Sequence, residues 1–268
     1  MPTINVNGVE LYYKESGRGP ETIVFSHGLL MDYSMFEAQR TAFDRRYRVI
    51  AYDHRGQGQS QDPGAGHDME TLTEDAAALI QALNAAPCHF AGLSMGGFVG
   101  MRLAARHRQL VRTLTLMNTG AQKEATFSRL KYGFLAQLVK LVGTGPFTGI
   151  AVKELFGKST RASQSPAKQA MLAEWTAKLR SRPKNTAKAL MGVMTRAAVS
   201  AEELAAVRCP TLIIAGEDDT PQPPFCAEYI AAAIRGSKLV KIPACGHSSS
   251  LEAPEAVVAA MQELMAGA

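Results

Sequence analysis

The stretch HFAGLSMGGFVG, residues 89–100, holds one serine among four glycines and decides the fold of this chain. Gly92, Ser94 and Gly96 follow the pattern G-x-S-x-G. The residues before them, CHFA, have the apolar character of a buried strand, and the run GGFVGMRLAARHR, which begins at Gly96, has helical spacing. A serine at such a strand-to-helix turn lies on a sharp bend with its hydroxyl above the sheet, where glycines avoid clashes with the neighbouring backbone. The pattern therefore predicts that Ser94 is a nucleophile.

The rest of the chain alternates runs of strand character with runs of helical spacing. The strand-like runs are ETIVFSHG, YRVIAYDHRG, CHFAGLS and RTLTLMN in the first half, and PTLIIAGEDD and SKLVKIPACGH near the end. Such runs are typical of strands buried on both faces of a parallel sheet. At the N-terminus, TINVNGVELYYKESG alternates polar and apolar residues around Asn7-Gly8, which indicates an antiparallel hairpin. We therefore expect an α/β fold with a mostly parallel, eight-stranded sheet and helices on both faces.

The alternation stops between residues 121 and 200, where helical periodicity continues without a convincing strand. We expect this segment to be an inserted helical subdomain on a core formed by residues 1–120 and 201–268. It carries 14 lysines and arginines against 3 acidic residues, a net charge of +11, which leaves −6 for the rest of a chain whose total is +5. A solvated helical surface is one interpretation. The other is attraction of an anionic substrate or of an acidic surface, whereas no recognised fold or aromatic pattern favours nucleic acid binding.

The composition favours a folded globular protein. With 46% hydrophobic and 20% charged residues, the 268-residue chain can bury a large core and lacks the composition of disordered or fibrous proteins. Its four cysteines are scattered without a CxxC pair or a histidine at metal-ligand spacing, so neither a disulfide framework nor a metal site is expected. The N-terminus lacks the pattern of a signal peptide, and no apolar run reaches membrane-spanning length. We expect a cytoplasmic protein.

A nucleophilic serine needs a base to take its proton and an acid to orient that base. His247 directly follows the last strand-like run, which places it at the same edge of the sheet as Ser94. The acid can come from the end of the run LIIAGEDD, which supplies Glu217, Asp218 and Asp219. Position alone does not choose among these three.

These motifs together resemble the α/β-hydrolase family, and the resemblance covers almost the whole chain. The residues that carry it are His27-Gly28, DHRGQGQS, the turn GLSMGG, GEDDTP and GHSSSLEAPE. The resemblance implies the α/β-hydrolase fold, in which the inserted helices form a cap over the active site. Relatives that open epoxides or displace halide use an aspartate where this chain has Ser94, so the resemblance implies attack on a carbonyl carbon.

The resemblance also implies roles for individual residues. The acid in such relatives usually lies three residues after the glycine of the turn, which gives Asp219, with Asp218 as the alternative. The HGLLM loop is similar to the family's oxyanion-hole loop, so the backbone N–H groups of Leu29 and Met95 are expected to stabilise a negative oxygen.

Candidate substrate contacts lie in the HGLLM loop and in the expected cap. They are His27, Leu30, Trp175, Met191 and Met194. The three residues of the cap lie at helical spacings, for which packing in the core is the alternative interpretation.

The resulting hypothesis is a carboxylic ester hydrolase that needs no cofactor and no metal. Ser94, deprotonated by His247 while Asp219 orients the histidine, attacks a small ester or lactone, and water then releases the acyl group. The alternatives on the same residues are a cofactor-free haloperoxidase or perhydrolase and a hydrolase of carbon–carbon bonds. A non-enzymatic alternative is a small-ligand binding protein on the same scaffold.

Overall fold

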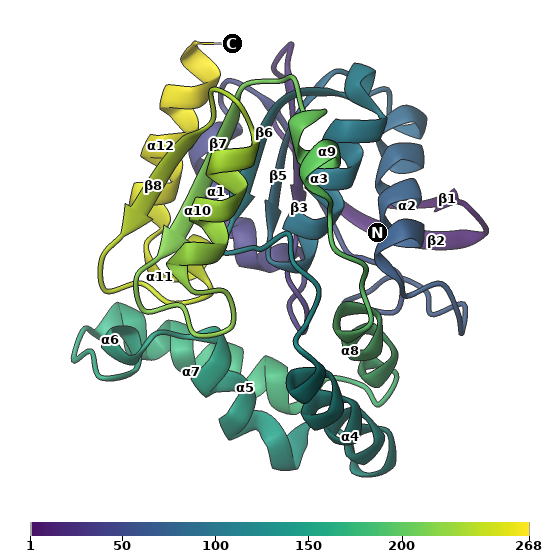
Figure 1. Ribbon diagram of the computed structural model, residues 1–268, viewed down its shortest axis with the longest axis vertical. Helices are drawn as coiled ribbons and strands as arrows, with labels where there is room; N and C mark the ends of the chain where they lie inside the picture. Colours follow the sequence, from purple (N-terminus) through teal and green to yellow (C-terminus); the bar gives the residue numbers. More distant parts are fainter. Residues whose placement is uncertain (1, 268) are drawn as a thin grey trace.

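In the computed structural model, which describes residues 2–267, eight strands form one sheet in the order β1-β2-β4-β3-β5-β6-β7-β8 (Figure 1). The first two strands pair antiparallel, as do β2 and β4, whereas all pairs from β4 to β8 are parallel. The predicted mostly parallel sheet with an N-terminal hairpin is confirmed. The strands are β1 (Thr3–Val6), β2 (Val9–Ser16), β3 (Thr22–Ser26), β4 (Arg48–Tyr52), β5 (Cys88–Leu93), β6 (Val111–Met117), β7 (Thr211–Gly216) and β8 (Lys238–Ile242).

Helices cover both faces of this sheet, and each face has its own apolar core. Because successive residues of a strand point to opposite faces, Ile23 and Phe25 of β3 pack in one core and Val24 packs in the other. The core around Val24 is covered by α2 (Met69–Ala82), α3 (Met95–Arg106), α9 (Ala201–Ala205) and α10 (Pro224–Ala233). The opposite core is covered by α1 (Glu37–Phe43) and α12 (Pro254–Ala266).

Between β6 and β7, the described residues form helices and no strand. We call residues 121–200 the cap segment. Its helices are α4 (Thr126–Val142), α5 (Thr148–Leu155), α6 (Lys158–Arg161), α7 (Pro166–Arg180) and α8 (Thr186–Met194), and Figure 1 shows them together at one end of the sheet.

Two hydrogen bonds join the cap segment to the loops that follow the last two strands. The backbone N–H of Ser159 donates to Asp218 after β7, at 3.0 Å, and the N–H of Gly157 donates to Glu252 in α11 (Ser249–Glu252), at 2.9 Å. The cap segment therefore lies at the carboxyl edge of the sheet, where open α/β sheets place their ligands.

Candidate active site

Ser94 lies at the turn between β5 and α3 with an unusual backbone conformation, φ 53° and ψ −109°. The glycines on either side allow this turn, because the backbone packs too closely for a side chain. A Cβ on Gly92 would lie 2.2 Å from the carbonyl oxygen of Gly96, and a Cβ on Gly96 would lie 2.0 Å from that of Ser26. The close approach holds the strained serine in place.

A chain of hydrogen bonds runs from this serine to a carboxylate. His247 Nε2 lies 2.8 Å from Ser94 Oγ, and His247 Nδ1 lies 3.0 Å from each carboxylate oxygen of Asp219. All three side chains are buried, and they come from the carboxyl ends of β5, β7 and β8. Because an ionised carboxylate only accepts, the imidazole proton belongs on Nδ1, and Nε2 is free to accept the serine proton.

The charge of Asp219 changes the basicity of His247. Burial by itself lowers the pKa of His247, since it disfavours the imidazolium form. The negative charge and the hydrogen bond of Asp219 act in the opposite direction, with help from the more distant carboxylates of Glu252 and Glu154. Together they raise the pKa of His247 above its ordinary value of 6.5 and make it a stronger proton acceptor.

Asp219 is held by donors other than the histidine. The side-chain amide of Asn118, just after β6, donates to Asp219 Oδ2 at 2.9 Å and to the carbonyl oxygen of Gly246, also at 2.9 Å. The backbone N–H of Gln222 donates to Asp219 Oδ1 at 2.9 Å. Both carboxylate oxygens therefore have a second donor, which fixes the carboxylate plane toward His247.

The other acidic residues near Asp219 lie in different surroundings. Asp218 accepts the N–H of Ser159 at 3.0 Å and so faces the cap segment. Glu217 is exposed to solvent. Glu252, in the GHSSSLEAPE motif, accepts the backbone N–H groups of Gly157, Gly246 and Ser248 at 2.9 to 3.1 Å, a role that the sequence did not indicate. This buried carboxylate braces the loop that carries His247.

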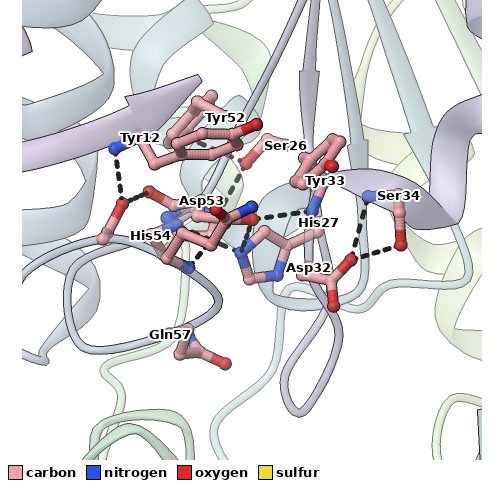
Figure 2. A network of polar contacts seen from close by, with 12 residues as sticks. Tyr12, Ser26, His27, Asp32, Tyr33, Ser34, Tyr52, Asp53, His54 and Gln57 are labelled. Atoms are coloured by element: carbon pink, nitrogen blue, oxygen red, sulfur yellow. Dashed lines mark hydrogen bonds and ion pairs between the residues drawn. The ribbon is translucent and has the colours of Figure 1, made fainter. Parts of the chain in front are cut away.

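The sequence led us to expect that His27 contacts the substrate, but His27 does not line the cavity. It instead supports the backbone of the HGLLM loop. Its side chain is fully buried, and Nε2 accepts the N–H of His54 at 3.0 Å (Figure 2). Its Nδ1 lies 2.7 Å from the carbonyl oxygen of Gly28. Burial lowers the pKa of His27 to about 4, so the ring is neutral at pH 7. A neutral ring that accepts at Nε2 carries its proton on Nδ1, which then donates to Gly28.

Further bonds hold the same loop. Asp53 accepts the N–H of Tyr33 at 2.7 Å (Figure 2). Gln57 accepts the N–H of Leu30 at 3.2 Å. Both come from the DHRGQGQS motif after β4. Leu29 lines the cavity, and Met95 is the first residue of α3, where backbone N–H groups have no partner within the helix.

A cavity of about 400 Å³ opens in front of Ser94 and His247. Leu29, Leu30, Phe98 and Met194 contribute to its wall. Most of its remaining wall is apolar and comes from the cap segment, whose contributions include Leu135, Val139, Phe147, Ile150, Leu190 and Val193. The cavity is therefore shaped by the cap segment as well as by the sheet.

Two expected contacts from the cap segment do not line this cavity. Trp175 is buried in the core on the α1 and α12 face, with the ammonium group of Lys178 4.4 Å from its ring centre. Met191 packs against the opposite core. For these two residues the structure therefore favours the alternative interpretation, packing in the core, whereas Leu30 and Met194 lie where a substrate would.

The cavity wall does not share the net positive charge of the cap segment. The charged side chains on the cap-segment wall are Lys131, Glu124 and Glu154. Glu124 pairs with Arg196 at 2.8 Å, and Glu154 accepts the hydroxyl of Tyr132 at 3.2 Å. The interior is apolar with more acidic than basic groups, although the outside of the segment is basic.

Within residues 2–267, no three histidine, cysteine or acidic side chains cluster in a way that could hold a metal ion. Over the same range, none of the helices combines the length and the apolar character needed to cross a bilayer.

Comparisons with known proteins agree with this architecture. A model of the alpha/beta hydrolase fold matches residues 21–254. The chain is 30% identical to the AB hydrolase superfamily protein YisY of Bacillus subtilis, over 93% of this chain and 92% of that protein. It is 31% identical to 3-oxoadipate enol-lactonase 1 of Acinetobacter baylyi, over 88% and 86% of the two chains. A thermophilic esterase from Thermogutta terrifontis has a similar structure, with a TM-score of 0.90, 29% identity and coverage of 99% and 96%. The chain therefore belongs to the α/β-hydrolase fold family.

Proposed function

We propose that this protein is a serine hydrolase that cleaves a carboxylic ester or lactone through an acyl-enzyme. The observation that carries the proposal is the unbroken series of hydrogen bonds from Ser94 through His247 to Asp219, beside an apolar cavity. Family membership and the names of the relatives support hydrolytic activity, and those names include an esterase and an enol-lactonase.

The first half of the reaction acylates the serine. His247 Nε2 takes the hydroxyl proton as Ser94 Oγ forms a bond to the carbonyl carbon, and the C=O π electrons move to the oxygen. Asp219 stabilises the resulting imidazolium and keeps the ring oriented. The imidazolium then gives the proton to the leaving oxygen as the acyl–oxygen bond breaks. Water repeats the sequence on the acyl-enzyme, which releases the acid and restores Ser94.

The negative oxygen of each tetrahedral intermediate needs donors that are already in place. The backbone N–H groups of Leu29 and Met95 are the proposed donors, since one lies in the wall of the cavity and the other at the N-terminus of α3. A single donor of this kind is worth about 3 to 4 kcal/mol in the transition state. In this proposal His27, Asp53 and Gln57 act indirectly, by fixing the loop that presents Leu29.

The cavity favours a neutral, apolar acyl group over an anionic one. Its wall is formed largely by leucine, valine, isoleucine and phenylalanine side chains, and the carboxylates of Glu124 and Glu154 face it. The apolar wall and the carboxylate of Glu154 disfavour a substrate carboxylate, whereas Arg196 neutralises the charge of Glu124. The residues of the cap segment, 121–200, would then select the substrate while the core domain performs the chemistry.

A substrate panel with one matched variant tests the proposal. We expect hydrolysis of p-nitrophenyl butyrate and of a small lactone, and a fall of at least about 10³-fold in the Ser94→Ala variant. Peracid formation from acetate and peroxide, or cleavage of a dienone, in the absence of ester hydrolysis would instead assign the same residues to one of the alternative reactions. A folded protein that binds these compounds without turning any of them over would favour the binding-protein alternative.

A further inference from the structure

Helix α4 has two apolar faces on opposite sides, and only one of them is covered. Toward the interior, Ala136 and Val139 are buried and Leu135 lines the cavity. Toward solvent, four large apolar side chains stay open, with exposed fractions between 67% and 80%: Phe127, Leu130, Phe134 and Leu141. Their spacing of three, four and seven residues places them on one stripe of the helix. An apolar helix face that is left in water marks a contact surface.

Besides this stripe, formed by Phe127, Leu130, Phe134 and Leu141, the outer surface of α4 and α5 includes residues that line the cavity. Ile150 of α5 is 45% exposed and also lines the cavity, and the exposed Lys131 of α4 lines it as well. Six of the eight large apolar side chains that are exposed among residues 2–267 lie in α4 and α5. Figure 1 shows α4 at the outer edge of the cap segment, away from the sheet. The apolar surface therefore borders the entrance through which a substrate passes.

The charged residues of α4 are all basic. Helix α4 contains three basic residues and no acidic one. Lys123, Arg129, Lys131 and Lys140 are exposed. The ion pairs of the cap segment are made by other basic side chains, namely Lys158, Lys178, Arg182, Lys188 and Arg196. The surface around the stripe thus combines exposed aromatic rings with unneutralised positive charge.

These observations distinguish between two kinds of partner. A second copy of this chain, placed symmetrically on the stripe, would bring the basic residues of both copies together. An anionic lipid surface instead offers negative headgroups to the lysines and an apolar layer to the aromatic rings, which is how interfacial helices bind. We propose that the outer face of α4, with Ile150 beside it, docks the protein on an anionic lipid surface and turns the cavity mouth toward that surface.

Vesicle co-sedimentation tests the proposal directly, and it does not depend on turnover, so the proposed hydrolysis can fail or succeed separately. The probes are large vesicles of phosphatidylcholine alone and of phosphatidylcholine with about 30% phosphatidylglycerol. We expect the full-length protein to bind the mixed vesicles at least about ten-fold more tightly than the neutral ones, and to lose most of this binding as salt rises from about 0.05 M to about 0.5 M.

A pair of double variants locates the surface. Phe127→Gln with Phe134→Gln removes two exposed aromatic rings from α4, and Phe225→Gln with Tyr229→Gln removes two from α10 of the core. We expect the α4 variant to lower vesicle affinity at least about ten-fold, and the α10 variant to change it by less than about two-fold. Both variants should keep the circular dichroism spectrum and the hydrolysis of a short ester free in solution, since none of these side chains lines the cavity.

Three results would overturn the proposal. They are the absence of binding to the mixed vesicles, equal binding to both kinds of vesicle, and equal losses in the α4 and α10 variants. Sedimentation velocity provides a fourth: a dimer that dissociates when Phe127 and Phe134 are replaced would show that a second copy covers the stripe instead.

Discussion

Replacing Asp219 by asparagine removes one negative charge at the end of the hydrogen-bonded series and leaves the size of the side chain unchanged. In the native protein Asp219 Oδ2 accepts from Asn118, Asp219 Oδ1 accepts from Gln222, and both oxygens face Nδ1 of His247. An amide has one oxygen for these three donors. Its NH₂ group therefore meets a donor in either orientation, and a single neutral oxygen, shared with another donor, replaces the charged carboxylate that keeps the proton of His247 on Nδ1.

The loss in rate follows from the charge. Two unit charges about 4 Å apart attract each other by about 4 kcal/mol at an effective dielectric constant of about 20. Without that attraction the transition state, in which the imidazolium forms, is less stable by about this amount. The reaction then slows about 10³-fold. Histidine in the wrong tautomer adds to the loss, so we expect kcat/KM to fall by about 10³ to 10⁴ in Asp219→Asn.

The pH profile moves in a defined direction. His247 acts as a base in its neutral form, so kcat/KM rises as pH increases through its pKa. In the native protein Asp219 raises the pKa of His247 above 6.5, which places the midpoint of this acidic limb above 6.5. In Asp219→Asn burial remains while the attraction is lost, so the pKa of His247 falls and the midpoint moves to lower pH.

Initial rates with p-nitrophenyl butyrate from about pH 5 to about pH 9 measure both effects. Asp218→Asn is the matched control, because Asp218 faces Ser159 of the cap segment, and we expect it to stay within about two-fold of the native rate. The reasoning is refuted if the two variants lose similar activity, or if the acidic limb of Asp219→Asn stays in place or moves to higher pH.

Three other outcomes follow from the structure. Gly96→Ala places a Cβ 2.0 Å from the carbonyl oxygen of Ser26, so thermal unfolding should show a loss of about 3 kcal/mol, whereas a stable and active variant would contradict this close approach. Glu252→Gln leaves one buried backbone donor without an acceptor and should lower the free energy of unfolding in urea by about 2 kcal/mol; an unchanged value would exclude the bracing role. Mono-p-nitrophenyl succinate should have a kcat/KM about ten-fold below that of p-nitrophenyl butyrate, and the gap should narrow in Glu154→Gln, since the carboxylate of Glu154 lines the cavity. Equal rates for the two esters would show that the cavity does not select against an anionic acyl group.

The sheet could be predicted from the sequence because its signals are local. Buried parallel strands are short apolar runs, and the strand, the G-x-S-x-G turn and the helix that position Ser94 lie within a few residues of one another. The identity of the acid that orients His247 depends instead on contacts between distant parts of the chain. Glu217, Asp218 and Asp219 are adjacent in sequence, and only the course of the loop after β7 turns Asp219 toward His247 and Asp218 toward the cap segment.

The wall of the cavity could not be predicted in the same way. Helical periodicity gives the angles between side chains of one helix, but not the rotation of that helix against its neighbours. Met194 faces the cavity while Met191, one turn earlier, packs against the core. Likewise, nothing in the sequence near Asn118 indicates that its amide joins two distant loops, since both partners come from residues more than 100 positions later.

Covalent labelling with a fluorophosphonate probe shows directly whether Ser94 is an activated nucleophile. We expect one phosphonyl group per protein, located on Ser94 by peptide mass mapping, absent from Ser94→Ala and formed far more slowly in Asp219→Asn. Folded protein that takes up no label, or that carries the label on another residue, would contradict this expectation.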